Sequence, residues 1–481
     1  MAFHLIPRLD RDPKFVQQAQ TAGGKVAILF LFVLPLWLLN SYWRQMEVLL
    51  LVLTFLPQYR RQILVVAAPA LAILAPFWIP MDSLSLLAAR EGLPASYNLL
   101  LLARIATGAV VIGLAVAANA ILRHPKAGPL KRPLVAWHVL FCLLVVGTSL
   151  LPLPGAVRMA AWAFVFALSG YFWYFCYTLI DRTAKGHDAL PVQEGTWQPV
   201  WTVGASTGTP FVKGAAYLRE VEAKNPEELA VTQLKGVKLI WWATFLRIAF
   251  QGMMWGLHGS LLPTPIPTFD AAFSAGAAGH PYPVLWCWAS LIAAFFENII
   301  NLSIWGHQIV ACCRMAGFRA LRNTFRPLQA RTIAEFWNRY YFYFKELMVN
   351  VFFYPAFLRY FRGQPRLRKF AATMAAACFG NMIFHFFRDI HYCAELGLWK
   401  AIAGFHVYAL YCLVLGGAIG LSQIRSRKPP DPSASWFRSR LWPGICVGGF
   451  YCLLHIFDDT GRTYSIAQHL GFLFHLFAIG G

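Results

Sequence analysis

Long apolar segments separated by short polar connections dominate the chain. A helix needs about 20 apolar residues to cross the hydrocarbon core of a bilayer. Unpaired backbone groups in lipid cost several kcal/mol, so each such segment must be helical. The pattern therefore predicts an all-α polytopic membrane protein with about 11–12 transmembrane helices, the shortest segment being the uncertain one. The candidate spans are 26–44, 46–57, 62–80, 98–122, 134–153, 157–181, 237–257, 284–312, 370–390, 401–421, 441–457 and 466–480.

Composition supports a membrane protein. Of the 481 residues, 58% are hydrophobic and only 13% are charged, whereas a soluble protein carries about 25% charged residues. Aromatic residues make up 16% of the chain, which suits the aromatic belts of a bilayer protein. These values exclude a disordered, collagenous or disulfide-stapled secreted chain. We expect residues 1–481 to form a single integral membrane domain.

The charge balance indicates topology. The net charge of +21 comes from 42 Lys and Arg against 21 Asp and Glu. The basic residues cluster between apolar segments, as the positive-inside rule requires, so no nucleic-acid partner is expected. The 10 cysteines have no CxxC spacing and are interpreted as apolar packing residues, without a disulfide framework or a zinc site.

The region 333–358 does not fit a simple alternation of sides. It is apolar enough to enter the membrane, yet basic clusters flank it at 314–331 and 359–369. A single crossing would place one cluster on the wrong side of the membrane. We therefore predict a re-entrant segment at 333–358 that forms a wall of the active site. The alternative is two short helices packed as filler.

One long polar stretch, 182–236, is predicted to be a cytoplasmic loop. It contains Gly204–Pro210 and then an amphipathic stretch, Tyr217–Leu234, which is expected to form an interfacial helix. No internal repeat is evident in the sequence. This argues against a transporter of the inverted-repeat kind.

Ionisable residues inside apolar segments are functional candidates by default, because burying them in lipid is expensive. Asn381, His385 and Asp389 recur at every fourth position and so share one face of a helix. An imidazole can accept a proton from a hydroxyl near neutral pH, which makes His385 a candidate general base. The alternative is a packed histidine bonded to a backbone carbonyl.

Other polar residues also lie within or beside apolar segments. Glu297, Asn298 and Asn301 could line a polar tunnel or bond across helices, with Arg247 and Gln251 as partners. A further group lies near the C-terminus, and its spacing does not match that of metal ligands, so no metal site is predicted. Its members are His455, Asp458, Asp459, His469 and His475.

The densest polar segment, Glu335–Phe336–Trp337–Asn338–Arg339–Tyr340–Tyr341, is followed by aromatic residues up to Tyr354–Pro355 and a basic loop. It resembles the FW-x-R-W-H element of membrane-bound O-acyltransferases, most closely the bacterial branch that acetylates alginate and D-alanylates teichoic acid. His385 matches the position of the family histidine. His455–Asp459 with Ala467–Phe474 is similar to the family's closing segment. The resemblance covers about residues 330–480, the expected family-like core.

The sequence departs from the family at one important position. Where the bacterial branch has its first histidine and the eukaryotic branch an asparagine, this chain has Tyr341. Asn338 lies three residues earlier and offers an amide. The resemblance implies that Asn338 or Tyr341 orients the acyl carbonyl or stabilises the developing oxyanion, with His385 as the base.

The resemblance implies an O-acyltransferase that moves an acyl group, expected to be acetyl, from a cytoplasmic thioester donor to a hydroxyl. The donor would be acyl-CoA or an acyl carrier, and the acceptor a polysaccharide or a lipid-linked glycan. No bound cofactor is expected. Four further residues are predicted to bind substrate. They are Trp337, Arg339, Asn381 and Glu297.

The family branch also implies a location in the bacterial plasma (inner) membrane and a periplasmic acyltransferase partner. Two alternative functions remain open on the sequence. A catalytically inactive relative that kept the fold would be consistent with Tyr341. A transporter would use intramembrane Glu297, Arg247 and the His and Asp residues as a proton or substrate path.

Overall fold

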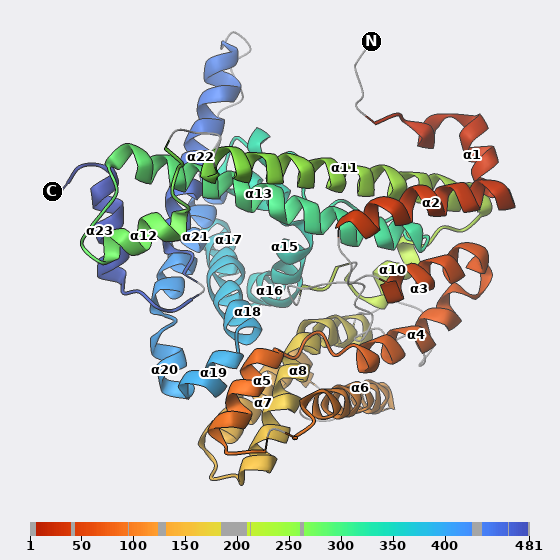
Figure 1. The fold of residues 1–481 in the computed structure, drawn as a ribbon, viewed down its shortest axis with the longest axis horizontal. Helices are drawn as coiled ribbons and strands as arrows, with labels where there is room; N and C mark the ends of the chain where they lie inside the picture. Colours follow the sequence, from red (N-terminus) through yellow and green to blue (C-terminus); the bar gives the residue numbers. More distant parts are fainter. Residues whose placement is uncertain are drawn as a thin grey trace. The chain divides into compact units, whose positions relative to one another are not determined.

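The structure is a computed structural model, and it describes residues 6–39, 44–94, 96–123, 131–183, 209–211, 213–259, 264–425, 435–459 and 461–479 (Figure 1). Helices account for nearly all of its regular structure. No strand forms among these residues. Their one β-type pairing is an isolated antiparallel bridge between Glu222 and Phe318. The predicted all-α fold class is confirmed. The region Gly204–Pro210, apart from its last two residues, lies outside the described residues.

Eight described helical segments are long and apolar enough to cross a membrane. Two further apolar helices, α3 (Arg44–Phe55) and α4 (Arg60–Leu74), meet at an angle of 111°. If this bent pair forms one broken span, the number of candidate spans among the described residues is nine. The chain is therefore a multi-pass membrane protein. The eight segments are Ala22–Leu39, Leu99–Ile121, Pro133–Leu150, Gly155–Asp181, Val284–Met315, Pro365–Arg388, Leu398–Ile424 and Phe437–Phe457.

The count is lower than the predicted 11–12, for three reasons. The candidates 46–57 and 62–80 form the bent pair α3 and α4 and make one span at most. The candidate 237–257 lies in α11 (Pro226–His258), where Arg247 and Gln251 interrupt the apolar sequence. The candidate 466–480 contains only α23 (Ile466–Leu476), whose 11 residues are too few to span the hydrocarbon core.

The described residues divide into two compact units. Unit 1 comprises Met1–Trp241, Gln308–Leu321 and His385–Ile402, and unit 2 comprises Trp242–His307, Arg322–Phe384 and Ala403–Gly481. Four helices contribute residues to both units, one of them, α20 (Leu398–Ala403), by its last residue alone. The other three cross a boundary further from their ends. They are α11, α13 (Val284–Met315) and α18 (Asn381–Arg388).

Unit 1 is built around α8 (Gly155–Thr183), whose aromatic residues, apart from the half-buried Phe164, are almost completely buried. The ring of Phe172 stacks on Trp137 of α7 (Pro133–Leu150) with centroids 5.3 Å apart, and it meets Phe387 of α18 at 5.0 Å. Gly170 allows the indole of Trp78 to approach the α8 backbone. The other helices of the unit are α1 (Pro13–Gln20), α2 (Ala22–Leu39), α3, α4, α5 (Met81–Arg90), α6 (Leu99–Arg123), α10 (Ala215–Val221), α19 (His391–Leu396) and, up to its last residue, α20 (Leu398–Ala403).

The predicted interfacial helix over Tyr217–Leu234 is interrupted. It consists of the end of α10 and the start of α11, joined by the non-helical residues 222–225. Glu222 in this link forms the bridge with Phe318, and the Ala223 N–H donates to the Gly317 carbonyl. The interruption is therefore held by backbone hydrogen bonds within unit 1.

Unit 2 contains the predicted re-entrant segment and the C-terminal helices. α21 (His406–Ile424) packs against α17 (Pro365–Met374) and the π-helical segment Ala375–Gly380, with Cys378, Tyr408 and Cys412 buried between them. Gly416 permits this close packing, because a Cβ there would lie 2.7 Å from the Cys378 Cβ. The other helices include α12 (Phe269–Ala277), α22 (Trp442–Leu454) and α23, and α12 packs on α23.

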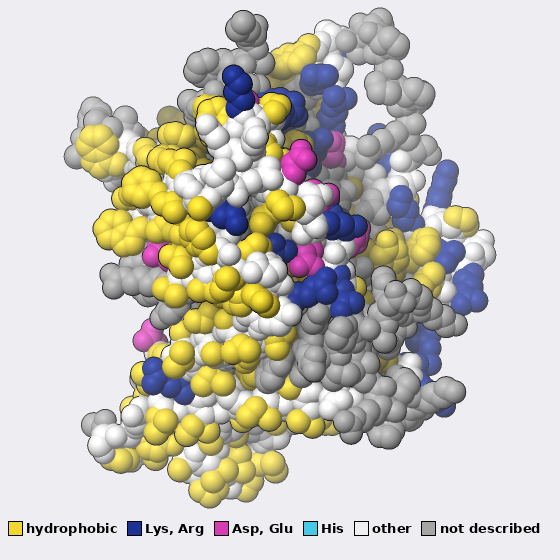
Figure 2. All heavy atoms as spheres, turned by 90° about the vertical axis from the view of Figure 1, so that its right-hand side faces the viewer, with side chains coloured by type: hydrophobic (Ala, Val, Ile, Leu, Met, Phe, Trp, Pro, Cys, Tyr) yellow, Lys and Arg dark blue, Asp and Glu magenta, His cyan; other side chains and the backbone are white. Residues whose placement is uncertain are grey.

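Hydrophobic side chains are widely exposed on the surface. On the face that Figure 2 shows, they cover much of the left part of the view, while most Lys and Arg side chains lie toward the centre, top and right. On α2, for example, Phe30, Trp37 and Leu38 are all more than half exposed. Exposed apolar area of this extent is a liability in water, but it is the normal surface of a protein embedded in lipid.

The close packing of α21 on the π-helical segment predicts a difference between two neighbouring glycines. Gly416→Ala should destabilise the protein by about 1–3 kcal/mol, since overpacking forces neighbouring atoms to move. Thermal unfolding of the purified protein in detergent measures the effect. The matched control is Gly417→Ala, because a Cβ at Gly417 meets no atom within 4 Å. Equal melting temperatures for the two variants would contradict the packing.

Candidate functional site

The predicted re-entrant segment is a series of short helical pieces. α14 (Ile333–Tyr340) is followed by α15 (Phe342–Met348), a π-helical segment (Val349–Phe353) and α16 (Tyr354–Arg359). The helix breaks at Tyr341, whose φ and ψ of −138° and 79° are not helical. Entry of this segment into the membrane stays a prediction.

The break at Tyr341 is held by the chain segment 323–325. The Asn323 carbonyl accepts from the Phe342 N–H at 2.9 Å, and the Asn323 Oδ1 accepts from the Tyr343 N–H at 3.2 Å. On the other side of the break, the Thr324 hydroxyl donates to the Tyr340 carbonyl at 2.9 Å. Backbone groups that lose their helical partners at Tyr341 therefore find protein partners instead, as a buried non-helical segment requires. Sequence analysis did not identify Asn323 or Thr324.

One face of α14 carries an ion pair. Thr332 caps the helix by accepting from the Glu335 N–H, and Glu335 accepts from Arg339 at 2.9 Å and from the Arg331 N–H at 2.9 Å. Partial burial raises the pKa of Glu335, but the hydrogen bonds from Arg331 and Arg339 and the charges of both outweigh it, so the pKa lies below its usual value. Glu335 is therefore ionised at neutral pH. The pair orients Arg339, one of the predicted substrate-binding residues.

Aromatic residues at another face of α14 and at its C-terminal end belong to a cluster of rings. Trp337 and Tyr341 contact Phe344 of α15, with ring centroids 5.7 and 5.4 Å apart. Phe344 in turn contacts Phe384 of α18 edge to face, at 4.8 Å. We call Trp337, Tyr341, Phe344 and Phe384 the aromatic cluster. It joins the predicted re-entrant segment to the helix that carries His385, which follows Phe384 in the chain.

The helix that carries His385 is irregular. A π-helical segment, Ala375–Gly380, precedes α18 directly, and π-helical turns are frequent at functional sites. Asn381 opens α18 and is only 2% exposed, and its Oδ1 has no hydrogen-bond partner among the described residues. His385 itself is partly buried. The carboxylate of Asp389, which shares its predicted helix face, is bound by Arg388 at 2.7 Å.

The predicted catalytic residues are distributed as follows. Asn338 is exposed on α14, Tyr341 is partly buried at the helix break, and both belong to unit 2. His385 belongs to unit 1, and the substrate-binding candidate Asn381, one helical turn earlier, to unit 2. The joint action of His385 with Asn338 or Tyr341 stays a prediction.

Glu297 has a partner that sequence analysis missed. Its carboxylate lies 3.0 Å from Nε2 of His258, which stands at the end of α11, while Nδ1 of the same imidazole lies 2.6 Å from the Ile266 carbonyl. The predicted partners were Arg247 and Gln251, which lie about three and about two helical turns earlier on α11. His258 and Glu297 are 39 positions apart in the sequence, so no local spacing pattern could have revealed the pair.

The C-terminal polar residues form a second small network. His455 lies 3.3 Å from the Asn298 amide and 3.7 Å from the Asp458 carboxylate. Burial raises the pKa of the nearby Tyr340 hydroxyl, and the charge of Asp458 raises it further. His469 lies 4.0 Å from Asp459. In the part of the chain that the structure describes, no three His, Cys, Asp or Glu side chains form a group that could hold a metal ion.

Unit 2 also contains a groove of about 1090 Å³ that is lined by α14, α13 and α22. Its basic residues are Arg326, Arg331, Arg339 and Arg440, and Glu335 is the one carboxylate among the described residues that line it. The rest of the lining is mostly aromatic, aliphatic or glycine. We call it the basic groove. It does not include Asn338.

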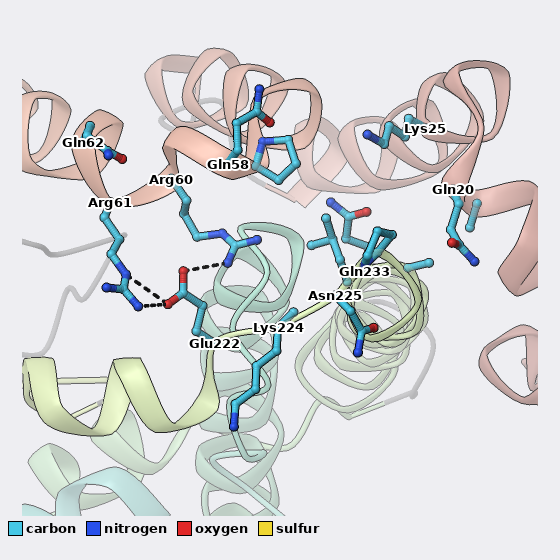
Figure 3. Close-up of a pocket in the computed structure, with 16 residues that line it drawn as sticks. Gln20, Lys25, Gln58, Arg60, Arg61, Gln62, Glu222, Lys224, Asn225 and Gln233 are labelled. Carbon is cyan, nitrogen blue, oxygen red and sulfur yellow. Dashed lines mark hydrogen bonds and ion pairs between the residues drawn. The ribbon is translucent and has the colours of Figure 1, made fainter.

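Unit 1 has a smaller basic pocket of about 610 Å³, which we call the N-terminal pocket (Figure 3). Glu222 binds both Arg60 and Arg61, at 3.0 and 2.6 Å, and so holds the two guanidinium groups beside each other. Lys25 and Lys224 add two further positive charges to the lining. Five amide side chains also line it, those of Gln20, Gln58, Gln62, Asn225 and Gln233, and small or aliphatic residues make up the rest. Its chemistry suits a soluble anion with several phosphate groups.

Comparison of the chain with known protein families and with curated proteins finds no match.

The hydrogen bonds at the helix break predict that Asn323 stabilises the site. Asn323→Ala removes the partner of the Tyr343 N–H and should cost about 1–3 kcal/mol, the penalty of a buried unpaired donor. Thermal unfolding in detergent measures it. Gln329→Ala, which changes an exposed amide six residues later in the same connection, is the control. A loss no larger than that of the control would mean that Asn323 does not hold the break.

The N-terminal pocket predicts a large effect of Glu222→Gln. Arg60 is only 4% exposed, and removal of the charge that it pairs with should destabilise the protein by about 3 kcal/mol. The exposed neighbour Glu220→Gln is the matched control, since only its backbone carbonyl is bonded to Arg319. A melting temperature of Glu222→Gln equal to that of Glu220→Gln would show that the ion pair adds nothing to stability.

Proposed function

We propose that the chain is a membrane-bound O-acyltransferase, with His385 as the general base. It would transfer an acyl group, expected to be acetyl, from a thioester donor to a hydroxyl of a polysaccharide or a lipid-linked glycan. The resemblance of Glu335–Tyr341 to the family element motivates the proposal. The observation that best supports it is the aromatic cluster, which packs this element against α18.

The aromatic cluster supports the proposal because it connects two helices that are both irregular. α14 ends at a break whose backbone is held by Asn323, and α18 follows a π-helical segment. Both irregularities place polar residues in an apolar unit, which lowers the stability of the fold. Such costly features are concentrated at functional sites. A packed histidine in an ordinary helix would require neither.

The proposed reaction balances with the groups at hand. His385 accepts the proton of the acceptor hydroxyl as the oxygen attacks the carbonyl carbon of the thioester. The carbon–sulfur bond breaks, the acyl group becomes an ester, and the thiolate takes up the proton to leave as a thiol. Asn338 or Tyr341 would donate a hydrogen bond to the oxyanion that forms on the carbonyl. No metal or bound cofactor takes part in this scheme.

The N-terminal pocket supports a phosphate-rich donor such as acyl-CoA. Four cationic side chains against Glu222 give the pocket an excess of three positive charges. Arginine and lysine bind phosphate through charge-assisted hydrogen bonds. Location in a bacterial plasma membrane, and a periplasmic acyltransferase as a partner, are part of the same proposal.

The proposal predicts that His385→Ala abolishes transfer without loss of the folded protein. Membranes are supplied with labelled acetyl-CoA on the cytoplasmic side, and label in hydroxylamine-sensitive esters is counted. Removal of a general base should lower the rate by about 10²–10⁴-fold. His406→Ala is the matched control, because His406 is exposed and bonds only to the Ala403 carbonyl.

Equal transfer by wild type and His385→Ala, at equal abundance, would show that His385 is structural. Absence of transfer in the wild type that Tyr341→His restores would identify a divergent, inactive relative. Absence of transfer in both proteins, with every donor class supplied, would reject the acyltransferase and leave the transporter as the alternative.

A further inference from the structure

The basic groove combines two kinds of surface in one cavity. Arg331 and Arg440 are exposed at it, and Arg339 is held in place by Glu335. Four arginines against one carboxylate leave an excess of three positive charges. Guanidinium groups match phosphate oxygens in geometry as well as in charge. An anion with phosphate chemistry would therefore complement this part of the groove.

The remainder of the groove is apolar. Aromatic and aliphatic side chains of α13 and α22 line it, namely Trp288, Ile292, Phe295, Phe296, Ile445 and Leu453. Along α22, Gly444, Gly448 and Cys452 recur at intervals of four residues and so share one side of the helix. All three line the groove together with Arg440 of the preceding π-helical segment, Phe437–Leu441. A Cβ added at Gly448 meets no atom within 4 Å. The groove is therefore open beside a line of small residues that leads away from the arginine.

We propose that the basic groove binds a membrane lipid with a phosphate headgroup. The phosphate lies among Arg331, Arg339 and Arg440, and one hydrocarbon chain follows the glycine side of α22. The groove volume of about 1090 Å³ exceeds that of a site for phosphate alone and is at the upper end for a small-molecule site. This inference does not depend on the acyltransferase proposal.

Charge and lining distinguish this groove from the N-terminal pocket. Both have an excess of positive charge, but five amides and mostly small apolar residues complete the lining of the N-terminal pocket, whereas aromatic and large aliphatic side chains make up most of the rest of the groove. A water-soluble anion would leave the apolar lining of the groove in contact with water. A lipid phosphate satisfies both parts at once, since burial of its chain removes that apolar area from water.

The test measures binding of radiolabelled dodecyl phosphate to the full chain in a neutral maltoside detergent. Arg331→Gln and Arg440→Gln should each weaken binding by about tenfold, the loss of one charge-assisted hydrogen bond. Arg438→Gln, an exposed arginine two residues before Arg440 that does not line the groove, should bind as the wild type does.

A second pair of variants tests the path of the chain. Gly448→Leu should fill the groove with a leucine side chain, and binding of dodecyl phosphate should be lost. The fold should tolerate the change, because a Cβ at this position meets no atom within 4 Å. Gly113→Leu makes the same change on the exposed side of α6, where a Cβ also meets nothing within 4 Å, and should have no effect. A single symmetric elution peak on size exclusion confirms that each variant is folded, and the two Arg→Gln variants test the site independently of the glycine.

Two competitors distinguish the lipid from other anions. Inorganic phosphate and coenzyme A should leave dodecyl phosphate bound, since neither has a hydrocarbon chain for the apolar lining. Displacement by inorganic phosphate would reduce the groove to a simple anion site, and displacement by coenzyme A would make it a nucleotide site. Either result overturns the proposal, as does binding that none of the groove variants changes.

Discussion

The backbone hydrogen bonds around Tyr341 are the constraint on which the rest of unit 2 depends. A break in a helix leaves N–H and C=O groups without partners, and in an apolar environment each of these costs several kcal/mol. The segment 323–325 supplies partners on both sides of this break. Beyond the break, Phe344 of α15 contacts both Trp337 and Tyr341, so the aromatic cluster is built across the break that this segment holds.

The fold class followed from the sequence because hydrophobic length is a strong signal for spanning helices. The composition and the eight apolar helical segments agree. The number of spans was overestimated where polar residues or bends matter more than average apolarity. Hydropathy alone could not show that α3 and α4 meet at 111°, or that the polar residues before 237 and the apolar residues after it form one continuous 33-residue helix, α11.

The candidate site was predictable only in part, because several of its contacts join residues that are far apart in the sequence. The polar character of Glu335–Tyr341 and the helix face of Asn381 and His385 are local patterns, which a sequence displays directly. The pair of His258 with Glu297 and the contact of Phe344 with Phe384 join residues about 40 apart. Such contacts follow from how helices pack, and no periodicity within one helix encodes them. Asn323 was missed for the same reason, since its role is to bind the backbone of another segment.

The central claim is acyl transfer, and its most direct test is the stoichiometry of the reaction of the purified wild-type protein in lipid nanodiscs. Labelled acetyl-CoA and a glycan acceptor are supplied, and free thiol and ester-linked label are counted together. The account predicts one thiol released for each ester formed. Thiol release without ester would indicate hydrolysis of the donor, and absence of both would contradict the assignment as an acyltransferase.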